Sequence, residues 1–172
     1  MIKGKSKLMV EHFVDEKDCH TLIKYWKDHS HLCTDDVDQH KHRNLHWSEI
    51  KSPAIKKLLT YYMEKNCFFV SHFFHTRVKL YSAARLVGWQ TGEEMDFHSD
   101  RDVEQNRTMD YSSLIYLNDE YVGGTLEFPD REQYSPTAGC NILFHAGAQN
   151  AHKVNKITKG KRYTIPSWYK II

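Results

Sequence analysis

The chain of 172 residues lacks the features of an exported or membrane-spanning protein. Its four cysteines, Cys19, Cys33, Cys67 and Cys140, show no C-x-x-C spacing. The N-terminal residues are charged, with no apolar run of signal-peptide length behind them, and no apolar segment is long enough to span a bilayer. The sequence therefore predicts a cytoplasmic protein with free thiols and no membrane partner.

Neither sign of charge dominates. The net charge is +2 and the basic residues form no dense block, so we expect no nucleic-acid partner. Internal repeats, low-complexity tracts and flexible linkers are absent as well. The chain does have 40% apolar and 13% aromatic residues, as is typical of a globular protein with a filled core. At this length we expect one domain, residues 1–172.

Two helical patterns lie in the first part of the chain. Residues 15–29 begin with Asp15 as a candidate N-cap and carry apolar residues at helical spacing. Residues 52–73 begin with Ser52 as a cap and Pro53 at the first helical position. The apolar stripes are Cys19, Leu22, Ile23 and Trp26 in the first helix, and Ile55, Leu58, Leu59, Tyr62 and Met63 in the second. Both stripes are interpreted as core.

Beyond residue 74 the hydrophobic period changes to two. The expected strands lie around residues 78–80, 86–87, 114–116, 126–128, 142–144 and 163–165, separated by turns. A helical part over about 1–74 followed by strands over about 75–172 predicts an α+β fold, with the helices packed on one face of a β-structure. Short antiparallel strands of this number can close as a double-sheet jelly roll.

A histidine and an aspartate two residues apart form the most informative motif. In a strand, His98 and Asp100 would point to the same side and could grip one ion, with a later histidine arriving from a neighbouring strand. Two imidazoles and one carboxylate on one face of a metal leave three positions open, as in non-haem iron oxygenases. With 12 histidines in the chain, both His145 and His152 are candidates for the third ligand.

Arg162 is a candidate anchor for an anionic co-substrate. In a strand it would share a face with Thr164, Pro166 and Trp168, and a face that carries a tryptophan is expected to be interior. An interior guanidinium needs an anionic partner, since an unpaired buried charge is very costly. Its fixed fork of donors can hold a carboxylate at two points. The alternative is a surface arginine in a basic cluster with Lys159 and Lys161.

Motifs around these residues occur in a characteristic order. They are Trp89-Gln90-Thr91-Gly92, Leu114-Ile115-Tyr116-Leu117-Asn118-Asp119, Gly123-Gly124-Thr125-Leu126-Glu127-Phe128-Pro129, Gly139-Cys140-Asn141-Ile142-Leu143-Phe144-His145, His152-Lys153-Val154 and Gly160-Lys161-Arg162-Tyr163. Over roughly residues 75–170 this series resembles the prolyl 4-hydroxylase branch of the 2-oxoglutarate/Fe(II) dioxygenases. The resemblance implies a double-stranded β-helix with the metal inside its open mouth.

The resemblance also implies residue roles. His98, Asp100 and His152 would hold Fe(II), and His152 is preferred to His145 because Arg162 follows it at the family interval of ten. Arg162 would bind the distal carboxylate of 2-oxoglutarate, assisted by the hydroxyl of Tyr116.

Three further positions carry weaker implications. Trp89 stands at the co-substrate position where the family usually has Tyr, and an indole can donate one hydrogen bond but accept none. Arg107 and Trp168 match family residues near the substrate, although an exposed loop arginine and a core tryptophan are the alternatives.

The implied activity is a dioxygenase reaction that uses Fe(II), 2-oxoglutarate and O2, with ascorbate as reductant, on a peptide or protein that contains proline. The same chemistry on another side chain, a free amino acid or a small metabolite is the alternative. A nucleic-acid dealkylase fits less well, because Trp168 stands where that family has a second arginine. A catalytically silent jelly-roll binding module is the rival from another class.

Residues 35–47 are rich in His and Asp, but their spacing fits no standard zinc pattern. We interpret them as a polar loop that forms a flap over the site, with residues 101–111 as its counterpart.

Overall fold

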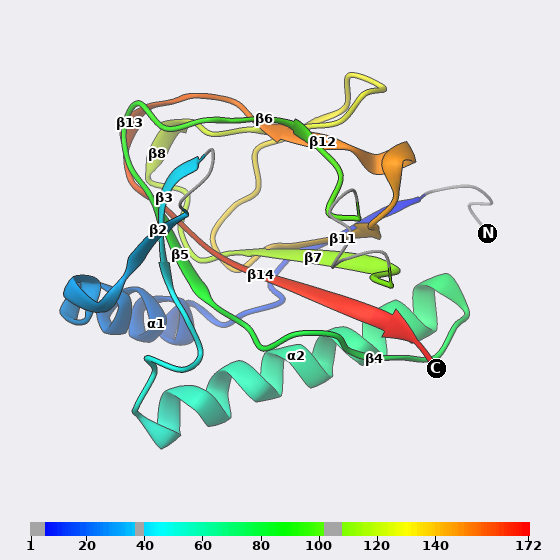
Figure 1. The fold of residues 1–172 in the computed structure, drawn as a ribbon, viewed down its shortest axis with the longest axis horizontal. Helices are drawn as coiled ribbons and strands as arrows, with labels where there is room; N and C mark the ends of the chain where they lie inside the picture. Colours follow the sequence, from blue (N-terminus) through cyan, green and yellow to red (C-terminus); the bar gives the residue numbers. More distant parts are fainter. Residues whose placement is uncertain (1–5, 37–39, 102–107) are drawn as a thin grey trace.

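Two β-sheets face each other, and two helices cover the outer face of the larger one (Figure 1). The structure is a computed structural model and describes residues 6–36, 40–101 and 108–172. Its helical elements are α1 (Glu16–Asp28), η1 (Ser30–Leu32), α2 (Pro53–Phe74) and η3 (Ala148–Asn150). Its strands are β1 (Lys7–Val10), β2 (Thr34–Asp36), β3 (His40–Leu45), β4 (Val78–Leu80), β5 (Leu86–Trp89), β6 (Met95–His98), β7 (Tyr111–Tyr116), β8 (Tyr121–Gly123), β9 (Leu126–Glu127), β10 (Gln133–Tyr134), β11 (Asn141–His145), β12 (His152–Val154), β13 (Ile157–Gly160) and β14 (Arg162–Ile171).

The larger sheet has the strand order β1-β11-β7-β14-β5-β3-β2, and β4 pairs with β14. The smaller sheet has the order β10-β9-β12-β6, and β13 and β8 form a separate two-stranded sheet. All of these pairings are antiparallel. The predicted α+β fold, a jelly roll with helices on one sheet, is confirmed.

The predicted helices form where the sequence places them. Ser52 caps α2, its hydroxyl accepting a hydrogen bond from the Ile55 amide at 3.4 Å, and Pro53 begins the helix. Asp15 occupies the N-cap position of α1, but its side chain makes no capping hydrogen bond, so that part of the prediction is wrong. All four cysteines are free. Among the described residues, no helix is both long and apolar enough to cross a membrane.

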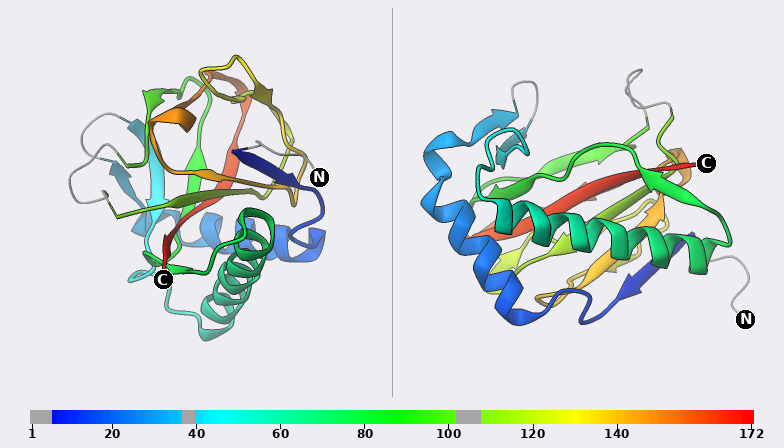
Figure 2. Two further views of the ribbon diagram at one scale, coloured as in Figure 1. Left: turned by 90° about the vertical axis from the view of Figure 1, so that its right-hand side faces the viewer. Right: turned by 90° about the horizontal axis from the view of Figure 1, so that it is seen from below.

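Strand alternation separates two apolar layers. Leu86, Tyr163 and Ile165 point toward α1 and α2 and join the core beneath the helices, which Figure 2 shows against one face of the sheet. Val87 and Trp89 point the other way and join a core between the two sheets. Each fully buried large side chain contributes roughly 1.5–3 kcal/mol to the free energy of unfolding.

The part expected to be helical, residues 1–74, also supplies three strands to the larger sheet. β1 pairs with β11 at one edge, and β2 and β3 form a hairpin whose second strand pairs with β5. The interpretation of residues 35–47 as a loop is therefore wrong for residues 35–36 and 40–45, which lie in β2 and β3. The sequence of β3, His-Lys-His-Arg-Asn-Leu, has no apolar alternation, and its pairing with β5 is what makes it a strand.

Candidate functional site

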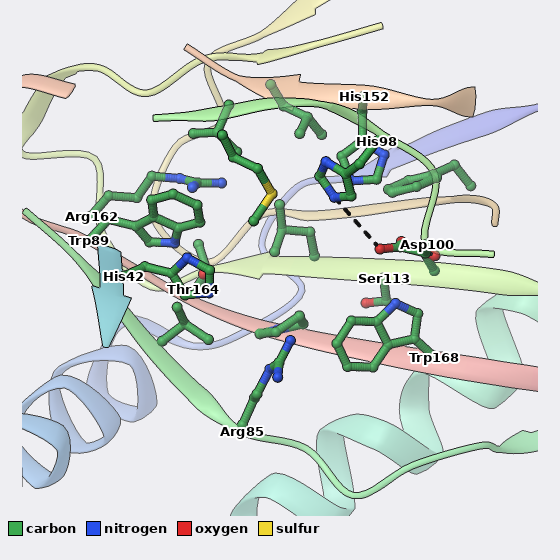
Figure 3. Close-up of a pocket in the computed structure, with 18 residues that line it drawn as sticks. His42, Arg85, Trp89, His98, Asp100, Ser113, His152, Arg162, Thr164 and Trp168 are labelled. Carbon is green, nitrogen blue, oxygen red and sulfur yellow. Dashed lines mark hydrogen bonds and ion pairs between the residues drawn. The ribbon is translucent and has the colours of Figure 1, made fainter. Parts of the chain in front are cut away.

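A cavity lies between the two sheets, and both sheets supply its walls (Figure 3). From the larger sheet, β5 and β14 turn alternate residues into it, because side chains two apart in a strand share a face. Its lining includes Arg85, Val87 and Trp89 from the β5 segment, Arg162, Thr164, Pro166 and Trp168 from β14, and Met95, His98, Asp100, Leu126, His152 and Val154 from the opposite wall. The predicted interior face of β14 is the one observed.

The three predicted metal ligands meet in this cavity. One ligand atom each from His98, Asp100 and His152 lies within 4.8 Å of the others. His98 ends β6 and His152 begins β12, and the two are directly paired in the antiparallel register. Their ring centroids are 4.4 Å apart, and the His98 Nε2 is 3.9 Å from the Asp100 Oδ1 (Figure 3).

Asp100 reaches the cluster from a turn and not from a strand. β6 ends at His98, so the prediction that His98 and Asp100 share one strand is wrong. The Ser112 hydroxyl of β7 donates a short hydrogen bond to Asp100 Oδ2. This bond comes from the opposite sheet and fixes the carboxylate where the strand no longer does.

The imidazoles are oriented for coordination through Nε2. The His98 Nδ1 lies 3.0 Å from the Asp96 carbonyl oxygen, and the His152 Nδ1 lies 3.1 Å from the Asn150 carbonyl oxygen. A carbonyl only accepts, so each Nδ1 carries the hydrogen and each Nε2 lone pair is available to a metal. Burial lowers the pKa of His152, opposed by the Asp100 carboxylate, and this favours the neutral ring that a metal requires.

Arg162 is fully buried in the same cavity. Its Nη2 donates to the Tyr116 hydroxyl at 3.1 Å. Its Nε and Nη1 have no hydrogen-bond partner among the described residues. Leaving two donors of a buried cation unsatisfied is expensive, so the site is suited to an anion. Burial raises the pKa of Tyr116, which remains a neutral donor available to the same anion.

The Trp89 ring lies between the side chains of Arg162 and His42 in the cavity. The Arg162 guanidinium carbon is 5.2 Å from the Trp89 ring centroid, and the His42 ring stacks on Trp89 at 4.3 Å with an interplanar angle of 24° (Figure 3). His42 was missed in the sequence because it lies within the segment interpreted as a loop. Strand alternation in β3 could have placed it only after β3 was recognised.

The remaining predicted residues have different positions. His145 packs its ring against Phe74 and Tyr111 at the end of β11 and is not part of the ligand cluster. Trp168 lines the cavity, with the guanidinium carbon of Arg85 5.0 Å from its ring centroid. Arg107 lies outside the described residues.

These groups fit an iron site with a 2-oxoglutarate anchor. Two imidazole nitrogens and one carboxylate form the donor set of a facial triad. The Nη1–Nη2 edge of Arg162, with Nη1 unsatisfied, can hold a carboxylate that accepts at two points.

Residues 81–170 match the sequence model of a family described as the 2OG-Fe(II) oxygenase superfamily. The match covers just over half of the chain. The chain therefore belongs to the 2OG-Fe(II) oxygenase superfamily, and its enzymes use Fe(II) and 2-oxoglutarate.

Similar curated proteins include prolyl 3-hydroxylases. Prolyl 3-hydroxylase 2 of Homo sapiens is 38% identical over 66 residues, which are 35% of this chain and 9% of the human protein. Prolyl 3-hydroxylase 1 of Gallus gallus is 33% identical over 66 residues, again 35% of this chain and 9% of the relative. The similarity thus spans about a tenth of the length of these relatives.

Similar solved structures include prolyl hydroxylases. A Pseudomonas putida prolyl-4-hydroxylase has a TM-score of 0.76 at 16% identity and is covered over 92% of its length, with 96% of this chain. A viral collagen prolyl hydroxylase from Paramecium Bursaria Chlorella virus-1, solved as a 2OG complex, has a TM-score of 0.76 at 14% identity, with 98% of this chain and 97% of the other covered. A prolyl hydroxylase from Trichoplax adhaerens, solved with a hypoxia inducible factor peptide fragment, has a TM-score of 0.77 at 13% identity, with 96% and 83% covered. At these identities the likeness establishes the fold.

Proposed function

We propose that this member of the superfamily is a 2-oxoglutarate- and Fe(II)-dependent dioxygenase that hydroxylates proline in a peptide or protein. The observation that carries the proposal is the placement of His98, Asp100, His152 and the unsatisfied donors of Arg162 in one cavity. A binding module has no need for all four.

Two comparisons support proline as the target residue. The sequence relatives named above are prolyl 3-hydroxylases, and the structural neighbours include prolyl 4-hydroxylases and a complex with a peptide. The sequence relatives and the structural neighbours differ in the proline ring carbon that their names give as hydroxylated, the 3-position for the former and the 4-position for the latter. We retain the 4-position expected from the motifs as the hypothesis, with the 3-position as the outcome that would replace it.

The residues divide into a metal-holding and an anion-holding group. His98, Asp100 and His152 would hold the iron, and Arg162 with Tyr116 would hold the distal carboxylate of 2-oxoglutarate. Bound Fe(II) and its co-substrate supply the O2-dependent hydroxylating chemistry, which releases succinate and CO2. The guanidinium orients the co-substrate by two-point hydrogen bonding, so the reacting end is fixed relative to the ligand cluster.

The cavity walls protect the reaction from water. Val87, Leu126, Phe144 and Val154 line it with apolar surface, and Phe144 packs its edge against His152 with the ring centroids 4.9 Å apart. An apolar lining that excludes water strengthens the hydrogen bonds to buried charges and limits side reactions.

Substrate contact is assigned to Trp168 and, among residues outside the described part, to Arg107. Trp168 offers an aromatic surface on the lining of the cavity. Proline-rich segments are pre-shaped as extended left-handed helices and lose little entropy on docking against aromatic surfaces.

We further propose that the enzyme works in a reducing compartment, the cytosol, with ascorbate keeping the iron reduced. All four cysteines are free, and burial raises the pKa of Cys19 to about 12, which suits a thiol kept as an inert core group.

Two measurements test the function. Anaerobic addition of Fe(II) and 2-oxoglutarate should give a weak visible charge-transfer band, which a binding module would not show. Proline-containing peptides incubated with iron, 2-oxoglutarate, ascorbate and O2 should gain one oxygen by mass spectrometry, and NMR of the product identifies the carbon. If free amino acids or another side chain were oxidised and proline were not, the proposed proline substrate would be wrong and the alternative substrate class would take its place.

A further inference from the structure

The edge strand β1 sends a buried lysine toward the smaller sheet. Lys7 is the direct partner of Phe144 in the antiparallel pairing of β1 with β11, so the two side chains leave the larger sheet on the same face. Phe144 lines the cavity between the sheets, so that face is the one that carries the proposed site. Residues 6 and 7 lie outside residues 81–170, the segment that matches the family.

Lys7 binds the turn between β9 and β10. Only 8% of its side chain is exposed, and its ammonium pairs with the carboxylates of Asp130 and Glu132, the latter at 3.1 Å. A hydrogen bond from Lys7 lowers the pKa of Asp130, and hydrogen bonds from Tyr134 and Lys7 lower the pKa of Glu132, so both acids are charged at neutral pH. Because a buried charge without its partner is costly, Lys7 holds this turn close to β1.

The same ammonium reaches a ring that packs on a metal ligand. It lies 4.3 Å from the ring centroid of Phe128, a cation–π distance, and Phe128 is fully buried. The Phe128 centroid is 5.9 Å from that of His152 and 5.3 Å from that of Phe144, and Phe144 is 4.9 Å from His152. Two phenyl rings thus pack against the His152 imidazole, and Lys7 holds one of them.

Ser6 contacts the residue that orients the same imidazole. Its hydroxyl donates to Asn150 Oδ1 at 2.9 Å, and Asn150 is buried. Asn150 Nδ2 donates to the His145 carbonyl oxygen at 3.0 Å, so both ends of this side-chain amide are held. The Asn150 carbonyl oxygen lies 3.1 Å from His152 Nδ1 and accepts its hydrogen. Ser6 therefore helps to fix the acceptor that sets the orientation of the His152 ring.

His152 depends on such contacts because its own strand is irregular. The register of β12 with β6 shifts between His152 and Val154, so the regular backbone pairing is interrupted directly after the ligand. The orientation of a metal-bound imidazole is set by the groups around it as well as by its backbone. For His152 these groups are the two phenyl rings and the Asn150 carbonyl oxygen.

We propose that Ser6 and Lys7 are positioning residues for the metal ligand His152, Ser6 through Asn150 and Lys7 through Phe128. This inference rests on the proposed function for the identity of the metal ligands, and it is independent of the substrate. It makes β1 a part of the metal centre, although β1 is distant from all three ligands in the sequence.

Fe(II) affinity provides the first test. Lys7→Met keeps the apolar stem and removes the charge, and it should weaken Fe(II) binding roughly tenfold, the lower end of the effect of an outer partner of a metal ligand. Ser6→Ala should weaken it less, since Asn150 keeps its bond to the His145 carbonyl oxygen. Lys7→Arg keeps the charge and can pair with both carboxylates, so it should retain most of the affinity. An anaerobic competition titration with a chelator gives the values.

Leu8→Ala is the matched control. Leu8 lies in the same strand, but it packs on the opposite face of the larger sheet, in a cluster that includes Val70, Leu143 and Tyr169. The substitution weakens the attachment of β1 without removing a contact to Asn150 or Phe128. Its Fe(II) affinity should therefore stay close to that of the wild type, and thermal melting measures how far each variant is destabilised.

The visible band of the anaerobic complex with Fe(II) and 2-oxoglutarate is the second readout. In iron-saturated protein Lys7→Met should shift this band, because the His152 imidazole is less firmly oriented. Leu8→Ala should leave the band unchanged, since a loss of stability alone does not alter the coordination of the folded protein. Circular dichroism establishes that each variant is folded.

His152→Ala separates this inference from the proposed function. If it weakens Fe(II) binding while Lys7→Met and Ser6→Ala match the wild type in affinity and band, the positioning role is wrong and the ligand assignment stands. An equal loss of affinity in Leu8→Ala also overturns the positioning role, because the loss would then follow from strand attachment alone. If His152→Ala binds Fe(II) as tightly as the wild type, the ligand assignment itself is wrong.

Discussion

His98 and His152 are direct partners in the register of β6 and β12, and their rings lie 4.4 Å apart. The two strands are far apart in the sequence, so the ligand pair exists only when the smaller sheet has formed. The third ligand, Asp100, is held by Ser112 of the larger sheet. The geometry of the metal site therefore depends on how the two sheets pack against each other.

The ligand assignment predicts the effect of four substitutions. His98→Ala, Asp100→Ala and His152→Ala should each abolish iron-dependent turnover and weaken Fe(II) binding, because each removes one of three donors. His145→Ala should keep most activity, since its ring packs on Tyr111 and Phe74. Turnover and Fe(II) titration are measured together. Loss of activity in His145→Ala but not in His152→Ala would show that the third ligand is wrong.

Ser112 should act through Asp100. Ser112→Ala removes the hydrogen bond that orients the carboxylate, and loss of such an outer partner typically lowers metal affinity roughly 10–100-fold. Ser113→Ala is the matched control, because its hydroxyl bonds Asn141 at 2.8 Å and accepts from Asn66. A competition titration with a chelator measures Fe(II) affinity in both. Equal affinities would show that the Ser112 bond does not position the ligand.

Arg162 should control the co-substrate. Arg162→Ala leaves a carboxylate without its charged donors, so the 2-oxoglutarate requirement should rise roughly 10–100-fold, equivalent to about 1.5–3 kcal/mol. Arg162→Lys should retain part of the function, because it supplies charge without the fork. The dependence of succinate formation on 2-oxoglutarate gives the values. An unchanged requirement in Arg162→Ala would rule out the anchor.

Much of this arrangement could be predicted from local patterns. The apolar stripes of α1 and α2, and the cap at Ser52, follow from helical periodicity and capping chemistry. The interior face of β14 follows from alternation, because Trp168 and Arg162 lie an even number of residues apart.

What could not be predicted depends on contacts between distant segments. The polar β3 becomes a strand by pairing with β5, and this brings His42 against Trp89. Ser112 is one of two adjacent serines in β7, and its importance appears only when the turn after β6 places Asp100 beside it. Arg85 carries no motif, and its place beside Trp168 follows from the alignment of β5 with β14.

Gly88 allows α1 to approach the sheet closely. A Cβ added at Gly88 would lie 2.8 Å from Trp26 Cε2, closer than real contacts, and the Trp26 ring is itself packed against Tyr163 at 5.2 Å. Gly88→Ala should therefore lower the free energy of unfolding by about 1–3 kcal/mol, as measured by denaturant titration. The cost should shrink in a Trp26→Phe background, where the ring is smaller. An equal cost in both backgrounds would exclude this contact as its cause.

The last prediction concerns the stack of Arg162, Trp89 and His42. The Trp89 ring is supported by the nearly parallel His42 ring at 4.3 Å. Because the Arg162 guanidinium lies 5.2 Å from the Trp89 centroid, movement of the indole changes the position of the anchor. His42→Ala should thus raise the 2-oxoglutarate requirement several-fold, by about 1 kcal/mol for one aromatic contact, without abolishing Fe(II) binding.

The control for this variant is His46→Ala. His46 lies just beyond the same hairpin, bonds the Thr34 hydroxyl through Nε2 at 3.0 Å and is absent from the lining of the catalytic cavity. Binding of 2-oxoglutarate to the anaerobic Fe(II) protein, followed by its visible band without any peptide, compares the two variants. His42→Phe preserves a stacking ring and should restore most of the affinity. If His42→Ala binds 2-oxoglutarate as tightly as His46→Ala, then Trp89 holds its position without the histidine, because Arg162 and the sheet suffice to fix it.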